Sequence, residues 1–168
     1  MVRKRMKARI EPLVLLDNTV LSNFANIQQP MLIKMALGDT VSTVQEVIDE
    51  LKVGVEKGAI PDVNWAWLPI LSMTHDEQAT YRALLRRLNR GEAACLAVAF
   101  ARGGRVLTDD RDARKIAVEM QIPISGTLGI LVRLVDLGLL SVKEADQHLK
   151  KMIDTDYFSP VDSLTEIL

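Results

Sequence analysis

The apolar run at residues 93–101 constrains the fold more than any other part of the sequence. Alanine and leucine dominate it, so it predicts a helix that is apolar on nearly every side and therefore buried. Gly103 and Gly104 end this helix, and Val106 and Leu107 predict a short buried strand after them. Helical spacing of apolar residues resumes at Ala113, which predicts a second helix. The stretch from 91 to 117 thus predicts a buried helix, a buried strand and an amphipathic helix.

Strands and helices alternate along the rest of the chain. Short apolar runs predict the other strands, at residues 13–16, 40–42, 65–72 and 122–124. Pro69 makes the third of these an edge strand or an irregular strand, because proline cannot donate a ladder hydrogen bond. The alternation predicts a single three-layer α/β domain at residues 11–168, with a mostly parallel central sheet flanked by helices.

Several dipeptide and tetrapeptide signals predict where helices begin. A Ser or Thr followed three residues later by Glu is typical of a capping box. The sequence has this spacing at Thr43 and Glu46, Thr74 and Glu77, and Ser141 and Glu144. Pro30 predicts the start of a helix over 31–37, and Ser159-Pro160 predicts a final short helix.

The composition excludes several classes of protein. A chain of 168 residues with one cysteine, Cys95, has no internal disulfide framework, which favours a reducing, cytoplasmic location. No apolar run approaches the roughly 20 residues that a membrane span needs, so no membrane association is expected. The net charge of −1 hides a basic arm at residues 1–10. This arm is either a solubilising tail or a contact for nucleic acid.

Acidic residues recur at the ends of predicted strands and the starts of predicted helices. They are Asp17, Glu46, Glu92, Asp109 and Asp110. In a parallel sheet such positions converge on the carboxyl edge, where ligands bind. Carboxylates gathered there repel one another unless a cation intervenes, and Mg²⁺ or Mn²⁺ prefers oxygen ligands.

Each acid also has a structural interpretation. Asp17 and Asp109 are suitable helix caps, Glu46 completes a capping box, and Glu92 in a first helical turn gains from the helix dipole. Glu92 is the most informative, because a charge beside an almost wholly apolar helix is costly without a partner.

Four segments, in this order, resemble motifs of the PIN-domain family of metal-dependent ribonucleases. They are LLDNTVL at 15–21, STVQEV at 42–47, GEAA at 91–94 and LTDD at 107–110. The segments DDRDARK at 109–115 and SGTLG at 125–129 resemble a VapC-like prokaryotic branch, in which GEA replaces the usual third Asp. The resemblance covers about residues 13–168 and implies a PIN-like fold.

The resemblance implies a site for one or two Mg²⁺ or Mn²⁺ ions. The residues implied as catalytic are Asp17, Glu46, Glu92 and Asp110, and those implied as metal ligands are Asp17, Glu92, Asp110 and Asp109. Asp112 is a rival or helper to Asp110, and Glu50 a weaker rival to Glu46. Thr19 is placed to hydrogen-bond Asp17.

Three functions follow as hypotheses. The leading one is a metal-dependent endoribonuclease that acts on RNA. The resemblance further implies a homodimer and a role as the toxin of a toxin–antitoxin pair, with an antitoxin as partner. A non-catalytic nucleic-acid-binding or scaffold protein on the same fold is the alternative. A phospho-accepting receiver domain is the third, and the lack of a lysine in the last strand counts against it.

An arginine stripe is a candidate RNA contact. Arg82, Arg86 and Arg90 lie four residues apart, which predicts that they share one face of the helix that begins after Thr74. Such a face suits phosphate contacts, and an ordinary solvated face explains it equally well.

Overall fold

A parallel sheet of five strands forms the centre of the protein, in the order β3-β2-β1-β4-β5. The computed structural model describes residues 12–168. The strands are β1 (Val14–Leu16), β2 (Val41–Val44), β3 (Ile70–Leu71), β4 (Arg105–Leu107) and β5 (Ile124–Ser125). Every described pair of neighbouring strands is parallel, and Leu16 lies opposite Leu107 in the central pair.

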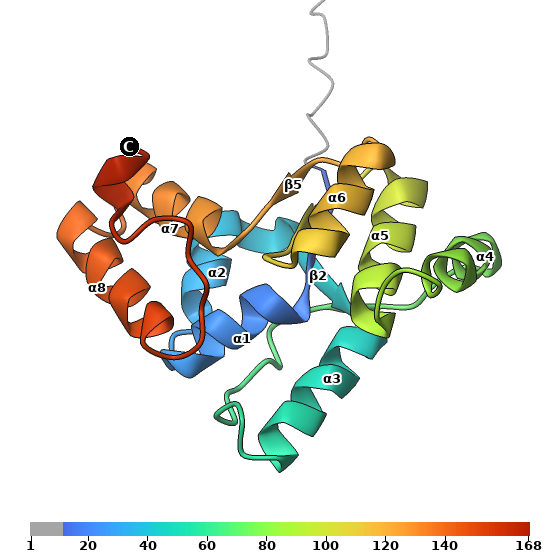
Figure 1. Cartoon of the computed structure of the whole chain (residues 1–168), viewed down its shortest axis with the longest axis horizontal. Helices are drawn as coiled ribbons and strands as arrows, with labels where there is room; N and C mark the ends of the chain where they lie inside the picture. The colour runs from blue at the N-terminus through green and yellow to red at the C-terminus, as the bar shows by residue number, and fades with distance from the viewer. Residues whose placement is uncertain (1–11) are drawn as a thin grey trace, which may run out of the picture.

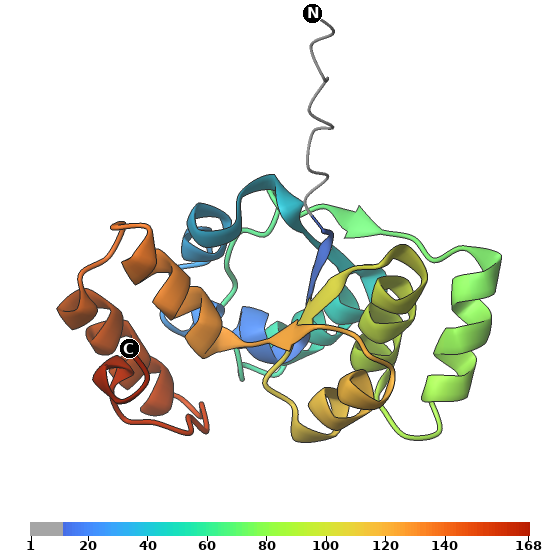
Figure 2. The same cartoon turned by 90° about the horizontal axis from the view of Figure 1, so that it is seen from above.

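Helices cover both faces of this sheet (Figures 1 and 2). They are α1 (Asn18–Asn26), α2 (Met31–Leu37), α3 (Gln45–Glu56), α4 (His75–Leu84), α5 (Arg90–Arg102), α6 (Arg111–Glu119), α7 (Thr127–Asp136) and α8 (Val142–Ile153). On one face, α5 packs against β1, β2 and β4, with α6 beside it and α4 outside it. On the other face α2 packs against α7, which carries α8. The three-layer α/β prediction is therefore confirmed.

The buried helix predicted from the apolar run is α5. Every residue from Gly91 to Ala99 is buried, because sheet, α3, α4 and α6 surround the helix. The helix ends at Gly103, which adopts a left-handed conformation with φ of 65° that glycine reaches without steric cost. The chain then enters β4 at once, so the end of α5 sets where β4 begins.

Several local predictions differ from the structure. The strand expected at 65–72 is reduced to β3, and the one at 122–124 lies at 124–125. Thr43 and Glu46 form no capping box, because β2 continues through Val44 and the Thr43 hydroxyl donates to the Leu16 carbonyl instead. The last short helix is Leu164–Glu166, which is capped by Ser163 rather than begun at Ser159.

Other predicted helix starts are confirmed. Thr74 with Glu77 and Ser141 with Glu144 form complete capping boxes at α4 and α8. Within residues 12–168 no helix is long and apolar enough to cross a bilayer. The predicted basic arm at 1–10 lies outside the described residues.

Candidate metal centre

The centre of the carboxyl edge lies between β1 and β4. The connection from β1 to β2 passes through α1 and α2 on one face of the sheet. The connection from β4 to β5 passes through α6 on the other face, so the strand order reverses between β1 and β4. Asp17 follows β1, and its backbone N–H donates to the Leu107 carbonyl of β4 at 3.0 Å. Thr108, Asp109 and Asp110 follow β4. These four residues are therefore held beside one another at the crevice where ligands of such sheets bind.

Asp17 is almost completely enclosed, with 1% of its surface exposed. Its Oδ2 accepts hydrogen bonds from the hydroxyls of Thr108 (2.7 Å) and Thr19 (3.2 Å). Its Oδ1 is also buried but has no hydrogen-bond partner among the described residues. Burial raises the pKa of Asp17 to about 6, although the Thr108 hydroxyl, the nearby Asn18 backbone N–H and the Thr19 hydroxyl lower it. A buried carboxylate oxygen without a donor is costly unless a ligand supplies the missing interaction.

Glu92 lies at the start of α5 and is 6% exposed. Its Oε2 accepts from the Asn89 backbone N–H, and its own N–H donates to Asn89 Oδ1, so the two residues form a capping box. The pKa of Glu92 is raised to about 7, first by burial and then by repulsion from Asp17, Asp110 and Glu50. Four acids therefore share one electrostatic environment.

Glu50, one turn after the predicted Glu46, is an α3 acid that acts on Asp17 and Glu92. Its Oε1 accepts from the Gly91 backbone N–H at 3.0 Å, at the start of the helix that carries Glu92. A side chain at position 91 would meet the Glu50 carboxylate at 2.7 Å, so glycine permits this approach. Repulsion from Glu50 contributes to the raised pKa of both Asp17 and Glu92. Glu46 lies one turn earlier, and both acids line a surface cavity beside Tyr81 and Arg90.

Asp110 caps α6, where its Oδ1 accepts from the Ala113 N–H at 2.8 Å. Its own N–H donates to the hydroxyl of Thr108, which in turn donates to Asp17. Thr108 thereby connects the two aspartates. Asp112 differs, because it is exposed on α6, where its charge acts on Arg87. The structure gives no support to Asp112 as a helper of Asp110.

Asp109 has a structural role and faces away from this group. Its Oδ1 accepts from the Thr127 N–H at 3.0 Å, and its Oδ2 accepts from the hydroxyl of Thr127 and from Asn23 Nδ2. Gly126 is required there, because a Cβ would collide with the Asp109 carboxylate. The aspartate thus joins the end of β4 to α1 and to the start of α7. Its prediction as a metal ligand is not supported, because donors already occupy both of its oxygens.

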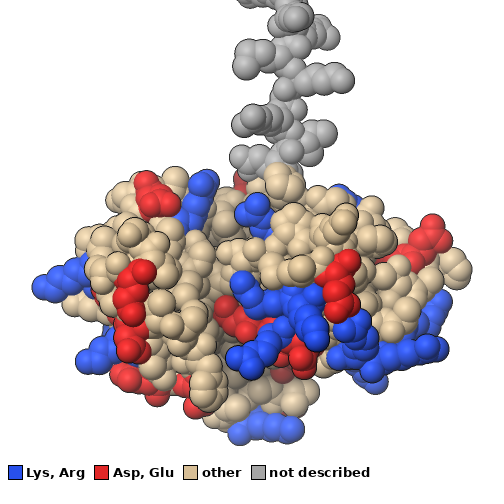
Figure 3. Space-filling view, turned by 45° about the horizontal axis from the view of Figure 1, so that its top comes forward, with Lys and Arg blue, Asp and Glu red and all other residues tan. Residues whose placement is uncertain are grey.

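The arginine stripe is not a helix face. Arg82 belongs to α4, which ends at Leu84, Arg86 lies in the following turn, and Arg90 begins α5. All three are exposed, and Arg90 borders the cavity of Glu46 and Glu50. Elsewhere, the space-filling view shows lysine and arginine side chains around a hollow that contains acidic side chains (Figure 3). Such a charge pattern can attract a polyanion to a cation-binding site.

Three residues that position the acids were not recognised in the sequence. Asn89 forms the capping box of Glu92, Thr108 connects Asp17 to Asp110, and Gly91 admits Glu50. Asn89 had a detectable signal in the sequence, because Asn-x-x-Glu has the spacing of a capping box and Asn is a favourable capping residue.

The donor set fits a hard divalent cation. Asp17, Glu50, Glu92 and Asp110 offer only carboxylate oxygens, and one of these, Asp17 Oδ1, is buried without a donor. Within residues 12–168 no three acidic, histidine or cysteine side chains are already close enough to hold an ion.

Comparisons with known proteins agree with this architecture. A family model described as a PIN domain matches residues 13–168. The chain is similar to the crystal structure of PAE2754 from Pyrobaculum aerophilum, with a TM-score of 0.53 and 21% identity. That similarity covers 74% of this chain and 98% of the other, and it concerns the fold. No curated protein matches the chain.

Proposed function

Because the chain belongs to the PIN-domain family, we propose that it is a metal-dependent endoribonuclease that hydrolyses phosphodiester bonds in RNA. PIN domains are typically nucleases, and this supports the enzyme class. We further propose that RNA is the substrate and that Mg²⁺ or Mn²⁺ is the cofactor. We also propose that the chain belongs to the VapC-like branch that its sequence resembles.

The unpartnered Oδ1 of Asp17 is the observation that carries the proposal. Thr108 and Thr19 hold the other oxygen, so the carboxylate has a fixed orientation. Removing a carboxylate from water without filling both oxygens destabilises the fold, and the pKa raised to about 6 reflects that cost. A bound cation would offset the cost, which gives the arrangement a functional explanation.

Four carboxylates would hold the cation, namely Asp17, Glu50, Glu92 and Asp110. Such an ion, when bound, supplies Lewis-acid stabilisation of a phosphate and lowers the pKa of an attacking water. The remaining residues position the ligands. Asn89 holds Glu92, the Gly91 N–H holds Glu50, and the Thr108 hydroxyl holds Asp17. We propose Glu50 in place of Glu46 because Glu50 contributes to the charge around Asp17 and Glu92.

A non-catalytic nucleic-acid-binding or scaffold role is the second candidate. Glu92 and Asp110 each cap a helix, so both carboxylates stabilise the fold without any metal. In that case the protein would bind RNA and leave it intact.

Cleavage of a defined RNA separates the two candidates. The purified full chain should cut the RNA in Mg²⁺ or Mn²⁺, lose the activity in EDTA, and lose it in the Asp17→Asn variant even with metal. Equal cleavage by wild type and Asp17→Asn would contradict the proposal. Tight binding without cleavage in either metal would favour the scaffold role.

The resemblance to VapC-type proteins also predicts a biological role and an assembly for this protein. A toxin function, an antitoxin partner, a cytoplasmic location and a homodimer remain predictions. Light scattering at micromolar concentration tests the dimer, and a monomer alone would contradict it.

A further inference from the structure

A second cavity adjoins the acidic group on the far side of the β4 terminus. It has a volume of about 400 Å³, and its lining includes Asp109, Arg111, Arg114, Tyr157 and Phe158. Asp109 faces this cavity, whereas the next residue, Asp110, acts on Glu92. Consecutive Cα atoms are about 3.8 Å apart, so the two residues place the cavity and the acids on either side of the same β4 terminus. A ligand in the cavity would therefore lie next to a phosphate at the acids.

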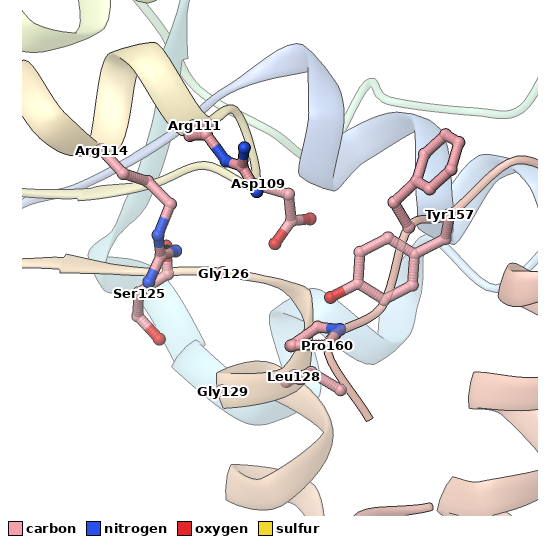
Figure 4. Close-up of a pocket in the computed structure, with 10 residues that line it drawn as sticks. Asp109, Arg111, Arg114, Ser125, Gly126, Leu128, Gly129, Tyr157 and Pro160 are labelled. Atoms are coloured by element: carbon pink, nitrogen blue, oxygen red, sulfur yellow. Dashed lines mark hydrogen bonds between the residues drawn. The ribbon is translucent and has the colours of Figure 1, made fainter. Parts of the chain in front are cut away.

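Arginine side chains form one wall of the cavity, as Figure 4 shows. Arg114 Nη1 donates to the carbonyls of Thr108 (2.8 Å) and Ser125 (3.2 Å), so its guanidinium group is fixed at the ends of β4 and β5. Both of these hydrogen bonds use Nη1, and Nε and Nη2 of the same guanidinium are the donors that we assign to a ligand. Arg111 is exposed at the start of α6. Two cations thus face a carboxylate, Asp109, whose oxygens are already hydrogen-bonded.

Aromatic side chains form the opposite wall. Tyr157 is buried, and its hydroxyl points into the cavity across from the two arginines (Figure 4). The next residue, Phe158, is 98% exposed although it lines the same cavity. A phenyl ring that contacts almost nothing in the fold contributes little to stability, and its open face is suitable for stacking.

We propose that this cavity binds one nucleotide of single-stranded RNA, next to the bond positioned at the acids. Arg111 and Arg114 bind its phosphate, and its base stacks on Phe158. The volume lies within the range of small-ligand sites. Arginine contacts to phosphate combined with aromatic stacking are the interactions by which proteins bind unpaired nucleotides. A paired base is stacked in its duplex, so the cavity selects single-stranded substrate.

This inference rests on the proposed function for the role of the acids, but its binding test is independent of cleavage. The test uses the full chain with Asp17→Asn, in which RNA stays intact, and a short labelled RNA of unstructured sequence. Fluorescence anisotropy measures binding of that strand and of the same sequence as a duplex. The added variants are Phe158→Ala, Phe158→Trp and Arg111→Gln.

Matched controls are available elsewhere in the chain. Phe100 is also exposed, at 56%, and lies near the far end of α5. Nine residues of helix separate it from Gly91, or roughly 13 Å. Arg105 begins β4 and is exposed at the opposite edge of the sheet. The controls are therefore Phe100→Ala and Arg105→Gln.

Phe158→Ala should weaken single-strand binding about tenfold, whereas Phe158→Trp should retain it. Arg111→Gln should weaken binding and lower the slope of log affinity against log salt by about 1. Duplex binding and both controls should remain unchanged. Unaltered binding by Phe158→Ala, equal losses in Phe158→Ala and Phe100→Ala, or no binding of single strands would overturn the inference.

The cleavage assay separates this inference from the proposed function. If wild type never cuts RNA while single-strand binding depends on Phe158, the cavity assignment stands and the nuclease proposal fails. If wild type cuts RNA with metal while Phe158→Ala binds normally, the cavity assignment alone fails.

Discussion

Two aspartates at the ends of neighbouring strands show how burial alone fails to identify a site. Asp17 follows β1 and Asp109 follows β4, and burial raises the pKa of both. Donors satisfy both oxygens of Asp109, from Thr127 and Asn23. Donors reach only one oxygen of Asp17, and the other is enclosed without a partner. The first aspartate therefore completes the fold, whereas the second leaves an interaction for a ligand.

The neighbours reinforce this difference. Asp17 shares its environment with the acids Glu50 and Glu92, whereas Asp109 lies close to the cation Arg114. Repulsion between Asp17 and the other acids favours a bound cation. The charge of Asp109, in contrast, is attracted to Arg114 within the protein itself. Substitutions at the two positions should consequently affect different properties.

The largest expected effect is on cleavage. Asp17→Asn should lower kcat/KM on the order of a thousandfold, about 4 kcal/mol, because it removes an anionic ligand and its share of transition-state stabilisation. Asp109→Asn, assayed well below its unfolding temperature, should retain most of the activity. Comparable losses in the two variants would remove the distinction between them.

A pH dependence of stability should be the next largest effect. The folded-state pKa of Asp17 is about 6 and its ordinary value is 3.8, so the native state binds more protons between these values. The metal-free protein should lose on the order of 2–3 kcal/mol from about pH 4 to pH 7, with Glu92 acting in the same direction. Chemical denaturation in EDTA measures this. Asp17→Asn should make the profile shallower, with the contribution of Glu92 remaining, and a stability that increases over this range would contradict the account.

A smaller effect is expected on stability at position 109. Asp109→Asn should lower the free energy of unfolding by about 2 kcal/mol, because an amide nitrogen would face donors from Thr127 or Asn23. Asp112→Asn is the matched control, since that exposed residue should change stability little. Thermal and urea unfolding of the two variants gives the comparison. Equal stabilities would show that the hydrogen bonds of Asp109 contribute little.

The smallest effect concerns the choice of acid on α3. Glu50→Gln should weaken Mn²⁺ binding about tenfold, on the scale of one altered ligand contact. Glu46→Gln should leave it nearly unchanged, because Glu50 is the α3 acid that accepts from the Gly91 N–H and acts on Asp17 and Glu92. A greater loss in Glu46→Gln would restore the assignment made from the sequence.

The fold could be predicted well from the sequence because its signals are local. The apolar run at 93–101 required a buried helix, and the alternation of short strands with helices required a layered sheet. Predictions failed where tertiary contacts outweighed local chemistry. Thr43 has ideal capping spacing, yet β2 extends past it and its hydroxyl bonds the Leu16 carbonyl across the sheet.

The site was less predictable, because residues adjacent in sequence diverge in space. Asp109 and Asp110 are consecutive, but Asp109 accepts a hydrogen bond from Thr127. Asp110 instead caps α6 and repels Glu92. No spacing rule indicates which of the two faces the acids. Glu46 and Glu50 pose the same problem, since both lie on the same helix and only packing against Gly91 brings Glu50 to the group.

Calorimetric titration of Mn²⁺ into wild type, Asp17→Asn and Asp109→Asn at pH 7.5 tests the central claim most directly. Wild type and Asp109→Asn should bind the ion with similar affinity and release only a fraction of a proton, from Glu92 with its pKa of about 7, because Asp17 with a pKa of about 6 is already ionised at this pH. Asp17→Asn should bind at least about tenfold more weakly. Equal affinity in wild type and Asp17→Asn, or loss only in Asp109→Asn, would contradict a cation site built on the unpartnered oxygen of Asp17.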